Sequence, residues 1–157
     1  MKKRPILTIL LSIAIAEGVG FLSGYLSGDI GAVYRSFEQP PLAPPGWLFP
    51  IAWGILYALM GIAAALIYLN MSDDCAREEA LIYYGVQLAV NFSWSIVFFR
   101  FQALWLGVVI ILVLDLLVWI TYRKFSAVSR TAGVLLIPYL IWLLYATYLA
   151  VGVFFLN

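Results

Sequence analysis

The segment from Gln39 to Tyr68 reads QPPLAPPGWLFPIAWGILYALMGIAAALIY and carries the clearest structural signal in the chain. Its prolines predict a rigid lead-in to a helix that begins near Gly46, because proline is tolerated in a first helical turn, where backbone N–H groups lack partners. From Trp47 to Tyr68 there are 22 residues without a charge. At about 1.5 Å per residue, such a helix crosses about 30 Å of hydrocarbon. The segment therefore predicts a transmembrane helix.

Two side-chain stripes run along this predicted helix. The first consists of small residues at helical spacing, which allow a second helix to come close: Gly54, Ala58, Gly61 and Ala65. The second carries aromatic and polarizable bulk: Trp53, Tyr57, Met60 and Ala64. These stripes are consistent with ordinary helix packing and also with a face that lines a ligand pocket. The choice between the two interpretations depends on the residues of the other predicted helices.

The composition indicates a single membrane domain, residues 1–157. Hydrophobic residues make up 65% of the chain and charged residues 11%, whereas soluble domains average about 25% charged. There is no histidine, and Cys75 is the only cysteine, which removes the commonest general base, the commonest metal ligand and any disulfide. We expect no metal site, no covalent cofactor and no acid–base catalytic constellation. The net charge is +1 with no basic patch, so nucleic acid is not an expected partner.

Apolar runs divide the chain into five predicted spans, at about residues 5–26, 46–68, 80–99, 104–122 and 131–155. They predict an all-α membrane protein, a bundle of five transmembrane helices in the lipid bilayer. The first run has two interpretations, because Ala14-Ile15-Ala16 has the pattern of a signal-peptide cleavage site, but its spanning length favours a retained helix. Ser129 is the expected N-cap of the fifth span, and Pro138 should kink it.

The basic residues predict the orientation of the bundle. With five spans, alternate connections lie on opposite sides, so one side holds only Arg35 and Arg100. The other side holds seven basic residues: Lys2, Lys3, Arg4, Arg77, Arg123, Lys124 and Arg130. Because cytoplasmic connections carry the excess of Lys and Arg, we expect a cytoplasmic N-terminus and a C-terminus outside.

Three tryptophans lie too deep in the spans to be interfacial anchors. Trp53, Trp94 and Trp142 each need a partner for the indole N–H at a depth without bulk water. One face of the third span carries Gln87, Asn91, Trp94 and Phe98, and one face of the fifth carries Tyr139, Trp142 and Ala146. The amides could simply bond to neighbouring helices. We favour the other interpretation, a pocket for a flat, mostly apolar ligand.

Two carboxyl groups also lie deep, Glu17 in the first span and Asp115 in the fourth. A mid-span Asp costs roughly 2.5–3.5 kcal/mol on insertion scales, and no Lys or Arg lies at the same depth. We expect desolvation to favour the neutral, hydrogen-bonded acids. A proton relay and a structural role are both open, and for Asp115 the structural role is favoured.

Gly85, Ala89 and Ser93 form a second small-residue stripe on the third span, about 200° round from Gln87 and Asn91. One face of this helix could then line the pocket while the other meets a second subunit. The stripe predicts a homodimer through the third span, and close packing within one monomer is the alternative.

Several motifs follow the order and spacing of one membrane protein family. They are Gln39-Pro40, Pro44-Pro45, Trp47, Trp53, Leu56-Tyr57, Met60-Gly61, Gln87-Leu88, Asn91, Trp94-Ser95, Phe98-Phe99, Asp115, Ala132-Gly133, Leu135-Leu136, Pro138-Tyr139-Leu140, Trp142, Ala146 and Tyr148-Leu149. On these residues the chain resembles the TspO/MBR family of tryptophan-rich sensory proteins and translocator proteins.

The resemblance implies a five-helix bundle, often dimeric, in a bacterial cell membrane, whose first long loop covers a pocket. The family binds porphyrins and other tetrapyrroles. In some bacterial members, tryptophans that correspond to Trp53 and Trp142 take part in light-dependent porphyrin breakdown. By its position in the loop, Tyr34 resembles a lid residue. The expected ligand-binding residues are Tyr34, Trp53, Tyr57, Gln87, Asn91, Trp94, Phe98, Trp142 and Ala146.

The chain departs from the family pattern at Gln39, Leu42 and Ala150, where Lys, Trp and Asn are usual. No basic residue follows Tyr148, which argues against the sterol motif of animal members. The expected function is binding of a porphyrin-like tetrapyrrole with a sensing or regulatory role. Transport of tetrapyrroles or sterols and light-dependent porphyrin degradation are the alternatives, although no inverted repeat supports transport.

Overall fold

A computed structural model describes residues 4–157, so Lys2 and Lys3 of the predicted cytoplasmic cluster lie outside the described residues. The helices are α1 (Pro5–Leu26), α2 (Ile30–Ser36), α3 (Leu48–Leu69), α4 (Asp74–Ser95), a π-helical turn (Ile96–Arg100), α5 (Leu104–Val128) and α6 (Arg130–Leu156). Five of the described helices are long and apolar enough to cross a membrane: α1, α3, α4 with its π-helical end, α5 and α6. The predicted five-helix membrane bundle is confirmed.

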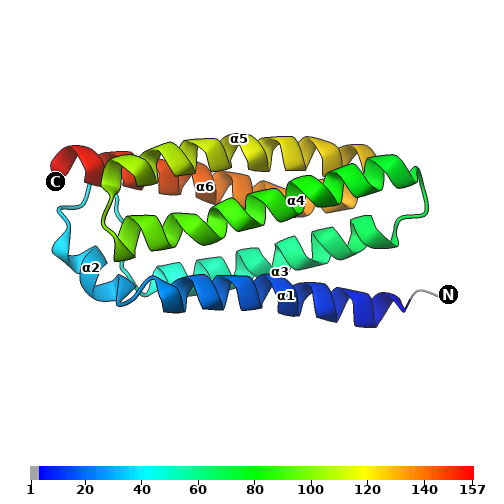
Figure 1. Ribbon diagram of the computed structural model, residues 1–157, viewed down its shortest axis with the longest axis horizontal. Helices are drawn as coiled ribbons and strands as arrows, with labels where there is room; N and C mark the ends of the chain where they lie inside the picture. Colours follow the sequence, from blue (N-terminus) through cyan, green and yellow to red (C-terminus); the bar gives the residue numbers. More distant parts are fainter. Residues whose placement is uncertain (1–3) are drawn as a thin grey trace.

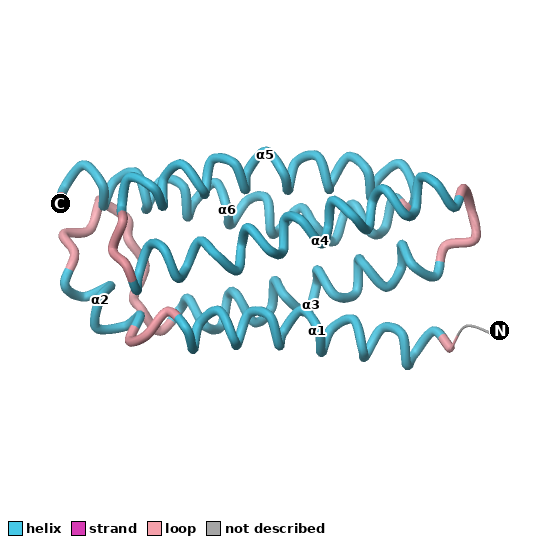
Figure 2. The backbone as a smooth tube through the Cα atoms, in the orientation of Figure 1, coloured by secondary structure: helices cyan, strands magenta, loops and turns pink. Residues whose placement is uncertain are grey.

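The long helices lie side by side and divide the molecule into two ends (Figure 1). The start of α1, the α3–α4 turn and the α5–α6 turn lie at one end. The short helix α2 and the C-terminus lie at the opposite end. Figure 2 shows the connection from α2 to α3 as a loop at that same end. We refer to it as the α2 end.

Two helix boundaries differ from the predicted spans because the predictions followed the apolar runs. α4 begins at Asp74 rather than near residue 80, since the Asp73 carboxylate accepts a hydrogen bond from the backbone N–H of Cys75 at 2.9 Å and caps the helix. α5 continues to Val128 rather than ending near 122, and there Lys124 pairs with Glu79 of α4 at 2.8 Å. Both extensions are polar, so hydropathy alone could not detect them.

The predictions for the start of α6 and for the first connection have different outcomes. Ser129 is the N-cap of α6, as predicted, and its hydroxyl accepts a bond from the backbone N–H of Ala132. α6 continues through Pro138 without a break. The connection between the first two spans was expected to be a polar loop, but it contains α2, whose first turn is capped by Asp29. A seven-residue helix is too short to produce a periodic hydrophobic signal.

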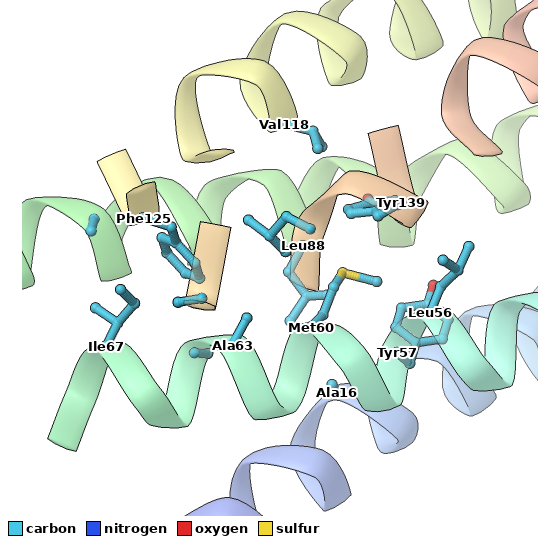
Figure 3. Packing of buried hydrophobic residues seen from close by; sticks show 14 of the residues in the cluster. Ala16, Leu56, Tyr57, Met60, Ala63, Ile67, Leu88, Val118, Phe125 and Tyr139 are labelled. Atoms are coloured by element: carbon cyan, nitrogen blue, oxygen red, sulfur yellow. The ribbon is translucent and has the colours of Figure 1, made fainter. Parts of the chain in front are cut away.

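The core forms around α3, which faces α1 on one side and α6 on the other. Met60, Ala63 and Ile67 are fully buried there against residues of the other four long helices. Figure 3 shows these side chains pointing from α3 toward Leu88, Phe125 and Tyr139, with Ala16 of α1 on the opposite side. Helix α3 is therefore the central element against which the bundle packs.

The two small-residue stripes have different surroundings. On α3, Gly61 lies so close to α1 that an added Cβ would be 2.6 Å from the Cα of Ile13. The predicted close helix contact is thus present at this residue. On α4, Gly85 and Ala89 are exposed, and an added Cβ at Gly85 would meet nothing within 4 Å. Packing within the described monomer therefore does not explain the α4 stripe at these two positions.

Candidate functional site

A cavity of about 540 Å³ lies at the α2 end, between α1, α2, α3 and α4. Its size falls within the roughly 300–1,000 Å³ of ordinary ligand pockets. The described residues that line it are Glu17, Gly20, Phe21, Ser23, Gly24, Tyr25, Ile30, Gly31, Tyr34, Gly46, Phe49, Pro50, Trp53, Gly54, Tyr57, Asn91, Trp94, Ser95, Phe99 and Ala146. The wall is predominantly aromatic and glycine-rich, with a few polar groups.

The aromatic part of the wall is anchored on Trp53 of α3. The Trp53 ring meets Tyr57 at 5.6 Å between centroids and Tyr139 at 6.1 Å in an edge-to-face arrangement. It also meets Trp142 edge-to-face at 6.5 Å, and Trp142 in turn contacts Phe49 at 5.9 Å. Edge-to-face packing fixes the orientation of each ring. Trp53 is thereby held as a rigid surface beside the cavity.

The end of the cavity farther from α2 is closed by a chain of polar side chains. The Tyr57 hydroxyl donates to Asn91 Oδ1 at 3.0 Å, and Asn91 Nδ2 donates to the Tyr139 hydroxyl at 2.6 Å. Tyr139 donates in turn to Gln87 Oε1 at 2.9 Å, and Gln87 Nε2 contacts the Met60 sulfur at 3.8 Å. This chain, the polar floor, joins α3, α4 and α6 where hydrocarbon offers no other partners.

Helix α2 covers the cavity through Tyr34. Its hydroxyl donates to the carbonyl oxygen of Pro44 at 2.6 Å, and its ring meets Phe49 edge-to-face at 5.0 Å. Burial, and secondarily the nearby Tyr145, raises the pKa of the Tyr34 hydroxyl, so this group stays a neutral donor. Tyr34 lies on the cavity wall, and its role as a lid residue stays a prediction.

The proline-rich connection from Glu38 to Pro45, which we call the strap, is held by the end of α6. Tyr145 donates to the carbonyl of Leu42 and Tyr148 to that of Pro41. Asn157 exchanges two hydrogen bonds with the backbone of Glu38. Leu42 has a positive φ of 66°, which β-branched and bulky residues adopt rarely. Nothing in the sequence indicated that α6, distant along the chain, positions this loop.

The π-helical turn at the end of α4 positions the opposite wall. In this turn the backbone N–H of Phe101 donates to the carbonyl of Ile96, five residues back, at 3.2 Å. Just before the turn, the Ser23 hydroxyl of α1 donates to the carbonyl of Phe92 at 2.8 Å. The last turns of α4 are therefore bonded directly to the α1 wall of the cavity.

The indole of Trp94 lines the cavity, and its N–H has a hydrogen-bond partner on α5. Its Nε1 donates to the carbonyl of Gly107 on α5 at 3.1 Å, and its ring stacks on Phe98 at 5.2 Å. Gly107 leaves room for Phe98, because an added Cβ would come within 2.6 Å of that ring. By contrast, the Nε1 of Trp142 is buried and has no partner among the described residues.

Six of the nine predicted site residues line the cavity: Tyr34, Trp53, Tyr57, Asn91, Trp94 and Ala146. The other three lie one layer behind. Gln87 is 1% exposed in the polar floor, Phe98 lies behind Trp94, and Trp142 lies behind Trp53 and Phe49. A helical stripe gives the direction of a side chain but not its distance from a cavity that occupies only one end of the helix.

The sequence also missed cavity residues on α1. Glu17 was noted as a deep acid without an assigned place, and it lies on the cavity wall. Gly20 and Gly24 follow at helical spacing, which is the signal that could have identified this face. Asp115, in contrast, is absent from the wall and accepts a hydrogen bond from Thr147 of α6 at 2.7 Å.

We predict that Asn91→Leu lowers stability by about 1–3 kcal/mol, because the buried Tyr57 hydroxyl loses its acceptor. Thermal unfolding in a neutral detergent measures the loss. Adding Tyr57→Phe should recover part of it, since the unpaired hydroxyl is then gone. Equal stabilities of the single and double variants would contradict the role of Asn91 as that acceptor.

With the geometry established, the chain can be compared with known proteins. The TspO/MBR family profile matches residues 12–156. The chain is 34% identical over 155 residues to the tryptophan-rich protein TspO of Chlorobaculum tepidum, covering 98% of each chain. It is 35% identical over 153 residues to that of Archaeoglobus fulgidus, covering 97% of this chain and 98% of the relative. The translocator protein of Ovis aries is 34% identical over 134 residues, with 83% and 78% covered. These matches, together with the five-helix bundle, show that the chain belongs to the TspO/MBR family.

Proposed function

We propose that this membrane protein binds porphyrin-like tetrapyrroles, and other flat apolar ligands, in the cavity beneath α2, with a sensing or regulatory role. The observation that carries the proposal is the combination of one large cavity, aromatic rings on its wall and a polar floor. A flat macrocycle gains from stacking on Trp53 and Trp94, while the floor and Tyr34 orient its polar edge.

The polar floor favours binding over passage. Behind Tyr57 and Asn91, the bundle is closed by Met60, Gln87 and Tyr139, each of which is at most 1% exposed. A transported macrocycle would have to separate the three helices that the floor joins. The name translocator protein belongs to relatives of this chain. For this chain, ligand-dependent flux across sealed vesicles would be the result that favours transport.

Light-dependent breakdown of the ligand is a second candidate function, favoured by one observation. Trp53 lines the cavity and its ring lies 6.5 Å from that of Trp142, so an excited ligand would sit beside one oxidisable indole with a second one directly behind it. Such chemistry needs no acid–base residues. In that case the pocket that binds the ligand would also be the site of its breakdown.

We also propose a homodimer through α4 and a cytoplasmic N-terminus. The outward-facing Gly85 and Ala89 support the dimer, because small residues let two helices approach closely in a bilayer. The basic residues at the end opposite α2 support the orientation. The cavity and α2 would then face the outer side.

Titration with protoporphyrin IX, followed by tryptophan fluorescence, tests binding. We expect quenching that saturates, and Trp53→Phe should weaken affinity by no more than about tenfold, because a ring is retained. Trp142→Phe should change it less, since Trp142 lies one layer behind. Trp119→Phe, on the exposed face of α5, is the matched control. Absence of saturable quenching in wild type would refute the proposal.

Illumination at saturating porphyrin separates simple binding from photochemistry. If the two indoles direct oxidation, Trp53→Phe and Trp142→Phe should lose most of the light-driven bleaching while still binding the ligand. The loss of porphyrin absorbance with time, in light and in darkness, is the measurement. Equal bleaching by wild type, both variants and free porphyrin would eliminate the photochemical candidate.

Ala89→Leu should shift the detergent-solubilised protein toward monomer, because the larger side chain forces the two α4 helices apart. Ala14→Leu, an equivalent change on the exposed face of α1, is the control. Light scattering coupled to size exclusion gives the mass of each. An unchanged dimer fraction in folded Ala89→Leu would place any interface elsewhere.

Cys75 reports the orientation. It is an exposed free cysteine in the first turn of α4, directly after the α3–α4 turn. With a cytoplasmic N-terminus, a membrane-impermeant maleimide should fail to label it in intact cells and should label it after lysis. Ready labelling of intact cells would reverse the proposed orientation.

A further inference from the structure

The cavity wall contains one carboxyl group and no basic side chain. Among the described residues that line it, Glu17 is the only Asp, Glu, Lys or Arg. Glu17 is the thirteenth residue of α1, about 18 Å along the helix from its start at about 1.5 Å per residue. The carboxyl therefore lies near mid-depth, where a charge without a partner is most costly.

The protein itself supplies no partner for this carboxyl. In the described part of the chain, Glu17 makes no hydrogen bond or salt bridge, whereas the other deep acid, Asp115, is bonded to Thr147. One turn along α1, the backbone of Gly20 packs on the Tyr57 ring, where an added Cβ would be 2.3 Å from Cε2. This contact brings Glu17 within electrostatic range of Tyr57, whose hydroxyl already donates to Asn91. The Glu17 oxygens remain available to a molecule in the cavity.

We infer that Glu17 is a specificity-determining residue that pairs with a hydrogen-bond-donating nitrogen of the ligand, most strongly with a protonated amine. A carboxylate and an ammonium group form a charge-assisted hydrogen bond, and in a site of low dielectric each removes the cost of burying the other. The inference rests on the proposed function, because the ligand is taken to occupy the same cavity. It predicts that a flat aromatic ligand binds more tightly when it carries a cationic substituent than when the same ring carries acidic substituents.

Two basic side chains beside residues at the α2 end, Arg35 and Arg100, make the preference directional. The Arg35 guanidinium is beside Gly31, at 3.3 Å from the position of an added Cβ, and Arg100 donates to the carbonyl of Leu26 at 2.9 Å. Acidic substituents of a ligand are therefore directed to the α2 end and nitrogen donors to Glu17.

Three derivatives of one macrocycle test the inference. Protoporphyrin IX is compared as the free diacid, as the neutral dimethyl ester and as the bis-amide with terminal amines, each titrated in a neutral detergent. The proteins are wild type, Glu17→Gln and, as a matched control, Asp115→Asn, which changes the other deep acid away from the wall. Glu17→Gln keeps the shape of a side chain that has no internal bond to lose, and thermal unfolding verifies that both variants are folded.

We expect wild type and Asp115→Asn to bind the amine derivative at least tenfold more tightly than the dimethyl ester. Glu17→Gln should lose most of that difference, because the neutral amide has no charge to pair with the ammonium group. An equal preference for the amine in wild type and Glu17→Gln, or a wild-type preference for the diacid over the ester that Glu17→Gln abolishes, would overturn the role of Glu17 and leave tetrapyrrole binding intact. Failure of all three derivatives to bind wild type would instead overturn the proposed function and this inference with it.

Discussion

The structure depends on one constraint, that polar groups in the hydrocarbon region must find partners within the protein. The polar floor meets it by joining Tyr57 of α3, Asn91 and Gln87 of α4, and Tyr139 of α6 in one chain of hydrogen bonds. Because every link joins two different helices, the chain fixes how α4 and α6 sit on α3. The polar floor also ends the cavity. The need to pair buried polar groups, which stabilises the bundle, therefore also shapes its binding site.

At the α2 end, hydrogen bonds from tyrosine side chains to the strap hold the site together. Three tyrosine hydroxyls, from Tyr34, Tyr145 and Tyr148, donate to backbone carbonyls of the strap, whose prolines have no N–H to offer in return. Side chains of α6 thereby supply what a proline-rich loop cannot supply for itself. The cover of the cavity is consequently coupled to α6, while its walls belong mainly to α1, α3 and α4.

The bundle and part of the cavity wall could be predicted from sequence, because hydropathy and helical spacing report which side of a helix faces inward. Asn91 and Gln87 show where this stops. They are one turn apart on one face, yet Asn91 lines the cavity and Gln87 lies behind it. Depth along the bundle is set by contacts between distant segments, such as the bond from the Ser23 hydroxyl of α1 to the carbonyl of Phe92 on α4. The helix α2 and the α6–strap bonds were missed for similar reasons, since they depend on short or long-range interactions without a periodic pattern.

The small residues explain why a cavity exists at one end of the bundle and a tight core at the other. Along α3, Gly61 is pressed against the backbone of α1 at Ile13, whereas Gly54, two turns nearer α2, has nothing within 4 Å of an added Cβ. On α1, Gly24 is equally open, although Gly20 is still covered by the Tyr57 ring. Gly24 and Gly54, which have open space beside them, thus lie on the α2 side of the covered Gly20 and Gly61. A stripe of small residues, which lets the two helices touch at Gly61, borders unfilled volume at Gly54, and Tyr57, whose ring packs on Gly20, lies between these two levels of α3.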